Sequence, residues 1–318
     1  MTRTVGSDLG SSLGSSLGSG PGSGRCGDVS ATAVRRRGDG RAPLYPRRRA
    51  VGRATIAAIA LATLAAAPGH GAPAEPPSGA PTIAVASSLR ASWPALERAW
   101  RATLPAVGAR PTFGASRTLA RQITRGAPFE LFLSADESSI EQVPPARRVD
   151  GTSARYAAGR LVLVTLDTFA DALSGPAAND DPLARLAARL AAAPDARLAI
   201  ADPDHAPYGR AAREVLDGAG LWPLPRARLI TGENAAQTLQ FLLAGGVDAA
   251  LVPASLTGAD APPPGVRVEP LESARHAPLV HRLVALDGAS PAALALGAWF
   301  ASPAARDALA AAGFDAPP

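Results

Sequence analysis

The chain of 318 residues contains no lysine and only one cysteine, Cys26. A single cysteine excludes an internal disulfide and any metal site built from several thiolates. Because every basic residue is an arginine and Ala, Gly and Pro are abundant, the missing lysine reflects a compositional bias and not a mechanism. Cys26 lies upstream of the apolar run at residues 54–67. A lipoprotein cysteine would follow such a run, so we do not expect Cys26 to be an anchor.

The net positive charge of the chain comes from its first quarter. The pI is about 10.4, which by itself suggests a nucleic-acid partner. Residues 1–74, however, contain ten arginines and three acidic residues, whereas residues 75–318 contain 22 arginines and 24 acidic residues. The body of the protein is therefore almost neutral, and we expect it to bind no nucleic acid.

Residues 1–74 are predicted to be a disordered leader followed by a secretory signal peptide. Residues 1–24 are rich in Gly and Ser and cannot form a core. Arginine clusters at 35–37 and 47–49 precede the apolar run, and Ala72-Pro73-Ala74 follows it. This order is typical of a signal peptide, and the run is shorter than the roughly 20 residues of a membrane span. We expect cleavage near Ala74 and a mature periplasmic chain. The translation start within residues 1–50 and the choice between general and twin-arginine export stay open.

The remaining chain alternates strands with helices, which predicts an α/β fold. Trp93 and Trp100 recur at helical spacing and are expected to pack in the core. We expect one lobe from residues 75–158 and 283–318, and a second from residues 159–282. Strands are predicted over 82–86, 110–113, 130–134, 161–165, 198–201, 228–231, 249–252 and 279–286, and helices over 89–102, 116–125, 138–144, 182–193, 208–219, 234–244 and 291–312.

Three of the predicted strands end in small polar residues just before a helix. The endings are Ser87-Ser88, Gly114-Ala115-Ser116 and the loop 202–209. Helix N-termini leave backbone N–H groups free and carry positive partial charge, so such junctions suit an oxyanion. Ligands of open α/β sheets bind at the carboxyl ends of the strands. These junctions therefore predict one anion site.

Six segments, in this order along the chain, resemble the periplasmic molybdate-binding proteins of ABC importers. They are residues 84–89, 113–123, 126–136, 159–164, 202–209 and 232–238. The resemblance implies a type II periplasmic-binding-protein fold, with mixed sheets, helices on both faces and a ligand cleft between two lobes. It also implies a monomer that captures molybdate or tungstate and delivers it to a membrane permease, without a cofactor and without catalysis. Molybdenum would be present only as its oxyanion.

The resemblance also implies the site residues. Ser88 and Ser116 match serines that donate both hydroxyl and N–H groups, while Tyr208 and Ala235 match positions that donate a backbone N–H. Pro253 stands where some members have a tyrosine, and proline can donate nothing. Tyr208 or Ser87 is then expected to replace that contact. Arg117 stands where a small residue is common, and would be either a positive charge at the cleft mouth or a solvated side chain.

Other interpretations remain open at this point. Ser88 and Ser116 also suit plain helix N-caps. The same fold would serve sulfate, phosphate or a small organic anion. A secreted serine hydrolase would use Ser88 or Ser134 with a histidine, but the chain lacks the Gly-x-Ser-x-Gly elbow.

Titratable residues offer little evidence for a metal site or for acid–base catalysis. His205, His276 and His281 are scattered, and no pair has the spacing of helix-borne metal ligands. Iron-binding relatives need clustered tyrosines, whereas the mature chain has only Tyr156 and Tyr208. Two aspartates, Asp136 and Asp202, follow strands and would act either as general bases or, as we expect, in capping and loop ordering.

Overall fold

The computed structural model describes residues 79–171, 181–258 and 262–318. All of them belong to one compact unit, Gly69–Pro318. The predicted leader, its cleavage site near Ala74 and Cys26 lie outside the described residues. Within the described ranges, every helix is too short or too polar to cross a membrane.

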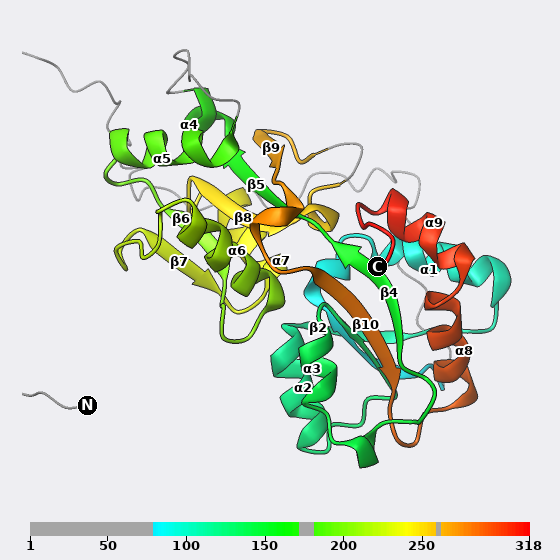
Figure 1. The fold of residues 1–318 in the computed structure, drawn as a ribbon. Helices are drawn as coiled ribbons and strands as arrows, with labels where there is room; N and C mark the ends of the chain where they lie inside the picture. Colours follow the sequence, from blue (N-terminus) through cyan, green and yellow to red (C-terminus); the bar gives the residue numbers. More distant parts are fainter. Residues whose placement is uncertain (1–78, 172–180, 259–261) are drawn as a thin grey trace, which may run out of the picture. The chain divides into compact units, whose positions relative to one another are not determined.

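The first sheet combines strands from both ends of the described chain (Figure 1). Its order is β2 (Arg110–Gly114), β1 (Thr82–Ala86), β3 (Leu131–Ser134), β10 (Leu279–Ala285) and β4 (Ala154–Gly159). Strands β1, β2 and β3 are parallel, and β10 pairs antiparallel with both β3 and β4. The parallel strands therefore end at the same edge of the sheet.

Helices cover both faces of this sheet because successive strand residues point to opposite sides. Ile83 and Val85 pack with α1 (Trp93–Thr103), α8 (Pro291–Phe300) and α9 (Pro303–Ala311), whereas Ala84 faces α2 (Ser116–Thr124) and α3 (Glu137–Glu141). Figure 1 shows these two helix groups on opposite sides. Trp93 and Trp100 are both buried, with ring centroids 5.1 Å apart, so their predicted core role is confirmed.

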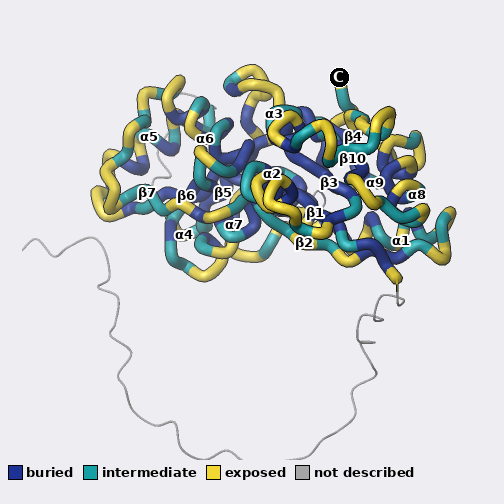
Figure 2. The backbone as a smooth tube through the Cα atoms, turned by 90° about the horizontal axis from the view of Figure 1, so that it is seen from below, coloured by how far each residue is buried: buried dark blue, intermediate teal, exposed yellow. Residues whose placement is uncertain are grey.

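The second sheet repeats the arrangement of the first. Its order is β7 (Leu229–Gly232), β6 (Leu198–Ala201), β8 (Ala249–Pro253), β5 (Leu161–Leu166) and β9 (Val266–Pro270). Strand β6 is parallel to β7 and β8, and β5 runs antiparallel to β8 and β9. The helices of this lobe are α4 (Asp167–Asp171), α5 (Pro182–Ala192), α6 (Pro207–Gly218) and α7 (Ala235–Leu243). Strands β1, β3, β5 and β6 are largely buried (Figure 2).

Four short 3₁₀ turns complete the described elements at strand ends and in loops. They are η1 (Ser87–Leu89), η2 (Pro145–Arg147), η3 (Ala254–Leu256) and η4 (Ser273–Arg275). Two of them, η1 and η3, directly follow the parallel strands β1 and β8. The chain therefore turns sharply at the strand ends that we expected to form a site.

The two-lobed α/β fold is confirmed, with several differences in detail. Helix α4 was not predicted, and the helical region predicted over 291–312 is two helices, α8 and α9. The sequence did not predict strands β4 and β9, which lie at the edges of the two sheets. It also placed residues 159 and 279–282 in the second lobe, whereas Gly159 pairs with Leu279 in the first sheet and β10 pairs there along its whole length. A strand pairs as one unit, so its first residues cannot belong to the other lobe. The other lobe limits remain predictions.

Candidate functional site

The carboxyl ends of the parallel strands in the two sheets meet each other. Turn η1, which follows β1, packs against α7 and η3 of the second lobe. Ala115, which follows β2, packs against Ala201 and Ala206. The Arg117 backbone N–H donates to the His205 carbonyl, with an N–O distance of 3.2 Å. The lobes are thus in direct contact at the predicted strand–helix junctions.

All five residues of the predicted anion site lie at these junctions, and each is at most 4 % exposed. Ser87 and Ser88 form the start of η1, Ser116 is the first residue of α2, and Ala235 is the first residue of α7. Tyr208 is the second residue of α6. Backbone N–H groups in the first turn of a helix have no acceptor within that helix. Both lobes therefore contribute unpaired donors to the region where they meet.

Ser88 differs from the other predicted site residues in the state of its hydroxyl group. Its Oγ atom is buried and completes no hydrogen bond. An unsatisfied buried polar group costs about 1–3 kcal/mol. Other described residues, among them Ser139, Thr165 and Ser302, also carry one, but of the five predicted site residues only Ser88 does. The Ser88 carbonyl, by contrast, accepts a 2.8 Å hydrogen bond from the Ser255 hydroxyl of the second lobe. The orphaned hydroxyl therefore lies directly beside a contact between the lobes.

Ser88 and Tyr208 also lie near each other. Burial raises the pKa of Tyr208 well above its usual value, and hydrogen bonding with the nearby Ser88 hydroxyl partly opposes this rise, although the two groups do not reach the geometry of a completed hydrogen bond. The phenol is therefore neutral at any physiological pH. Ala235 belongs to the same buried cluster as Tyr208, together with Ala86 and Ala135 of the first lobe. The structure thus brings Ser88, Tyr208 and the start of α7 to one region.

Ser116 is connected to this region through a single hydrogen bond. Its Oγ accepts from the Ala135 backbone N–H, with a distance of 3.0 Å. The hydroxyl proton of Ser116 then remains available to another acceptor. Ser116 does not cap α2, because the cap position is Ala115 and no side chain makes the capping bond. Ser88 likewise lies inside η1, after the cap residue Ala86.

A buried chain of three side chains crosses from the first lobe to the second. The hydroxyl of Tyr156 on β4 lies 3.2 Å from the Ser134 carbonyl and 3.1 Å from His281 Nδ1 on β10. On the other side of the imidazole, Nε2 lies 3.2 Å from the Tyr208 hydroxyl on α6. Burial lowers the pKa of His281 to about 3, with the charge of Asp136 opposing, so the imidazole is neutral.

Asp136 forms an ion pair between the lobes. Its carboxylate caps α3 by accepting from the Ser139 N–H at 3.2 Å, and it accepts a 2.8 Å hydrogen bond from Arg210 on α6. Burial alone would raise the pKa of Asp136, but bonds from Ser138, Ser139 and Arg210 lower it below the usual value. Asp136 is therefore ionised, and both of its carboxylate oxygens accept hydrogen bonds within the protein, in keeping with the expected capping role.

Arg117 and Asp202 are also engaged within the protein. The Arg117 guanidinium donates to the Asp204 carbonyl at 3.2 Å, so it contacts the second lobe as well as solvent. Asp202 orders its own loop by accepting from the Asp204 N–H at 2.8 Å. Pro253, at the end of β8, pairs with Leu161 in the second sheet.

Three side chains near the junctions were missed as site residues by sequence reasoning. Ser255 lies two residues beyond Pro253, in the same kind of strand-end turn as Ser87 and Ser88, and that pattern could have identified it. Nothing local identifies His281 or Arg210, because their partners are 73 and 74 residues away.

A pocket of about 430 Å³ lies between the lobes beside the predicted site. It is lined from the first lobe by Ala115, Thr118 and Gln122, among others, and from the second by Asp202, His205, Glu233 and Asn234. None of the five predicted site residues lines it. Its two carboxylates, Asp202 and Glu233, make it a poor place for an oxyanion.

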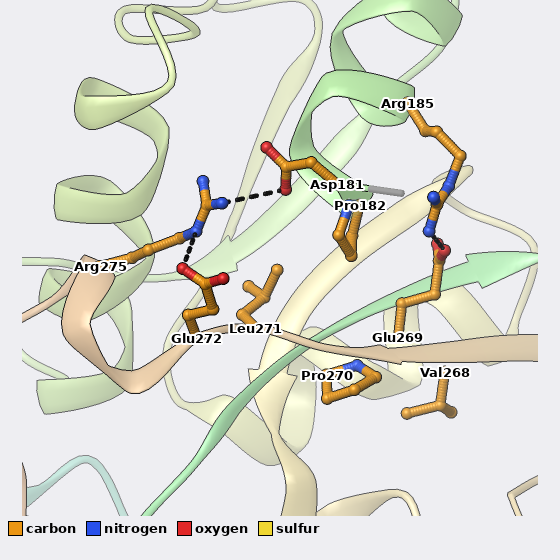
Figure 3. A pocket seen from close by; sticks show the side chains of 9 residues that line it. All are labelled: Asp181, Pro182, Arg185, Val268, Glu269, Pro270, Leu271, Glu272 and Arg275. Atoms are coloured by element: carbon orange, nitrogen blue, oxygen red, sulfur yellow. Dashed lines mark hydrogen bonds and ion pairs between the residues drawn. The ribbon is translucent and has the colours of Figure 1, made fainter. Parts of the chain in front are cut away.

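A second pocket, of about 440 Å³, lies on the second lobe and is shown in Figure 3. Its three carboxylates already have arginine partners: Arg275 pairs with Asp181 and Glu272, and Arg185 pairs with Glu269. Since both arginines are neutralised by acids, this pocket does not favour an anion.

The described residues show neither a metal cluster nor a serine–histidine pair. No group of three or more His, Cys, Asp or Glu side chains in the described ranges is arranged to hold a metal ion. Both nitrogens of His281 face tyrosines, and the Ser134 hydroxyl donates to the Asp136 carbonyl at 2.8 Å. No other histidine in this part of the chain bonds to a serine. The arrangement does not support a serine hydrolase.

Comparisons with known proteins agree with this geometry. The molybdate-binding protein ModA of Rhodobacter capsulatus is 39 % identical over 141 residues, which cover 44 % of this chain and 51 % of that protein. ModA of Azotobacter vinelandii is 34 % identical over 142 residues, which cover 44 % of this chain and 52 % of that protein. The chain thus spans about half the length of the curated relatives it matches.

The fold comparison extends over both lobes. The solved structure of the Azotobacter vinelandii periplasmic molybdate-binding protein matches with a TM-score of 0.63 and 25 % identity, covering 74 % of this chain and 99 % of that one. A family model for bacterial extracellular solute-binding proteins matches residues 81–315. Since this match includes both sheets and every junction described above, the chain belongs to the family of bacterial extracellular solute-binding proteins.

Proposed function

We propose that this protein is a periplasmic receptor that captures molybdate or tungstate between its lobes and delivers it to the permease of an ABC importer. The observation that carries the proposal is the buried Ser88 hydroxyl without a partner, in a region where helices of both lobes begin. The names of the relatives in two bacteria support a group-six metal oxyanion as the ligand.

The proposed donors are uncharged. Ser88 and Ser116 would donate hydroxyl and backbone groups, Tyr208 and Ala235 would donate backbone N–H groups, and Ser87 would replace the donor that Pro253 cannot supply. Hydrogen bonds to a charged acceptor contribute about 1.5–3 kcal/mol each. About six of them exceed the roughly 8 kcal/mol of micromolar binding, and the surplus offsets desolvation and lobe closure.

Neutral donors also explain how the site would select its ligand. A fully deprotonated tetrahedral dianion accepts at every oxygen, so a site made only of N–H and O–H groups suits it. Two arginines near the junctions, Arg117 and Arg210, are bound to a main-chain carbonyl and to Asp136. Size would then separate molybdate and tungstate from the smaller sulfate.

We further propose that the protein binds without catalysis, as a monomer, with no cofactor and no nucleic acid. The family to which it belongs binds solutes. The periplasmic location rests on the predicted signal peptide and on the solved relative, whose name describes it as periplasmic.

A thermal-shift panel on the purified protein tests this function. A ligand at 100 times its dissociation constant adds about 2.7 kcal/mol of stability. Molybdate and tungstate should therefore raise the Tm, while sulfate and phosphate at the same concentration should not. If only sulfate or phosphate raised the Tm, the ligand would be that anion and not molybdate or tungstate. If no anion raised the Tm, the proposal would be contradicted. Hydrolysis of a generic ester, abolished by Ser88→Ala, would favour the hydrolase instead.

A further inference from the structure

The hydroxyl of Tyr208 enters the first lobe although its helix belongs to the second. Helix α6 packs mainly on β6 and β8, and it also reaches β10. There the Tyr208 hydroxyl meets His281 Nε2 at 3.2 Å. Gly159 on β4 makes room for it, because a Cβ atom at that position would overlap the hydroxyl. Gly159 and His281 of the first lobe thus form a receptacle, which is filled by the Tyr208 side chain of the second lobe.

The hydrogen-bond direction along the chain follows from its first member. The Ser134 carbonyl can only accept, so the Tyr156 proton points to it. The Tyr156 oxygen must then accept from His281, which places the imidazole proton on Nδ1. A neutral imidazole with Nδ1–H has an acceptor at Nε2, so the Tyr208 hydroxyl donates to it. Every proton in the chain therefore has one assigned acceptor.

We propose that His281 and Gly159 are positioning residues for the anion site, which hold Tyr208 and the first turn of α6 against the first lobe when the lobes are closed. This inference rests on the proposed function, because its effect is on the backbone N–H of Tyr208 that faces the anion. Neither His281 nor Gly159 needs to touch the ligand. Both residues act through Tyr208, whose hydroxyl bonds to His281 and fits into the space beside Gly159.

The environment of His281 supports this role. The residue is fully buried, and the titratable groups around it are the two tyrosines and, at longer range, Asp136. Burial keeps both tyrosines protonated and the imidazole neutral. The link between the lobes is therefore a set of neutral hydrogen bonds that does not change with pH in the physiological range.

Loss of the receptacle should weaken ligand binding by destabilising the closed form. In the open form, the Tyr208 hydroxyl can bond to water. In the closed form without His281, it would be buried without a partner, which is unfavourable. Because ligand affinity falls with the population of the closed form, the penalty appears as a weaker Kd. We expect roughly a tenfold loss for His281→Leu.

Calorimetric titration of molybdate into matched variants tests the inference. His281→Gln retains a donor and an acceptor and should stay within about threefold of the natural protein. Tyr208→Phe should weaken binding about as much as His281→Leu, and the double variant should be no weaker than either, because both variants remove the same bond between the lobes, whereas the Tyr156–His281 bond lies within the first lobe. Gly159→Ala should also weaken binding by excluding the hydroxyl. His276→Gln, whose Nδ1 faces the Ala277 carbonyl, serves as the control and should bind normally.

Nitrogen-15 NMR of the imidazole provides a readout that does not depend on the variants folding. His281 should show the Nδ1–H tautomer in the molybdate-bound protein, at any pH between 5 and 8. The Nε2–H tautomer, or unchanged affinity in a folded His281→Leu variant, would overturn the inference while leaving the proposed function intact. If the natural protein does not bind molybdate, the proposed function fails first, and this inference fails with it.

Discussion

Two buried serines, Ser88 and Ser116, support the proposed anion site. Ser88 keeps a buried hydroxyl without a partner, and Ser116 uses its oxygen to accept from Ala135 while its proton remains free. Both residues lie inside their helical turns and not at the cap positions. Capping therefore does not account for their hydroxyl groups, and a ligand would.

The first prediction concerns the Ser116 hydroxyl. Ser116→Ala should weaken molybdate binding by about 1–3 kcal/mol, because an oxygen of the bound anion would lose its donor in a dry site. Calorimetric titration measures the change directly.

A serine at the N-cap of another helix serves as the control. Ser290 caps α8 by accepting from the Ala293 N–H at 3.3 Å, on the first lobe and away from the junctions. Ser290→Ala should lower the free energy of unfolding by about 1 kcal/mol and leave the molybdate Kd unchanged. Equal affinity of Ser116→Ala and the natural protein would remove Ser116 from the site.

The positions of the candidate site residues at the starts of helical turns were predictable, because their signal is local. Ser87, Ser88, Ser116, Tyr208 and Ala235 all follow a strand and open a helical turn, and each motif is contained in a few residues. Ser255 bonds to a carbonyl 167 residues away, and His281 bonds to a tyrosine 73 residues away. No short window of sequence contains both partners, so these contacts needed the fold.

Among the elements, α6 makes several contacts between the lobes. Its Tyr208 reaches β10 and its Arg210 reaches Asp136, while the preceding loop accepts from Arg117. The Arg210–Asp136 pair is only partly exposed, with the Asp136 side chain 7 % accessible. An ion pair in that setting is worth more than one on the open surface. Helix α6 should therefore help to hold the lobes together.

The ion pair of α6 gives a second prediction. Arg210→Gln should weaken molybdate binding by about 1 kcal/mol, because the closed form loses a bond that the open form does not make. Arg155→Gln is the matched control, since Arg155 pairs with Glu137 within the first lobe at 2.9 Å. That control should bind normally. If both variants bind like the natural protein, the Arg210 pair does not contribute to closure.

Most of the elements could be predicted from periodicity, except for two edge strands and the five-residue helix α4. Strand β4 is Ala-Arg-Tyr-Ala-Ala-Gly, whose alanines and glycine have low strand propensity. Strand β9 is five residues long and ends in proline. Both strands form by pairing with β10 and β5, which are strongly apolar. Their partners, and not their own sequences, determine their conformation.

For the molecule as a whole, two sheets with the same pattern of parallel and antiparallel neighbours meet through the ends of their parallel strands. The chain passes from the first sheet to the second between Gly159 and Leu161, and returns between Pro270 and Leu279. Two crossings allow the lobes to move relative to each other while staying connected. A ligand that touches both lobes would favour the closed arrangement.

The most direct test of this account is the position of molybdenum in crystals grown with molybdate, located by its anomalous scattering. We predict one strong peak between the lobes, within hydrogen-bonding reach of Ser88, Ser116 and the backbone of Tyr208 and Ala235. A peak confined to the second-lobe pocket of Figure 3, or no peak in crystals saturated with molybdate, would contradict it.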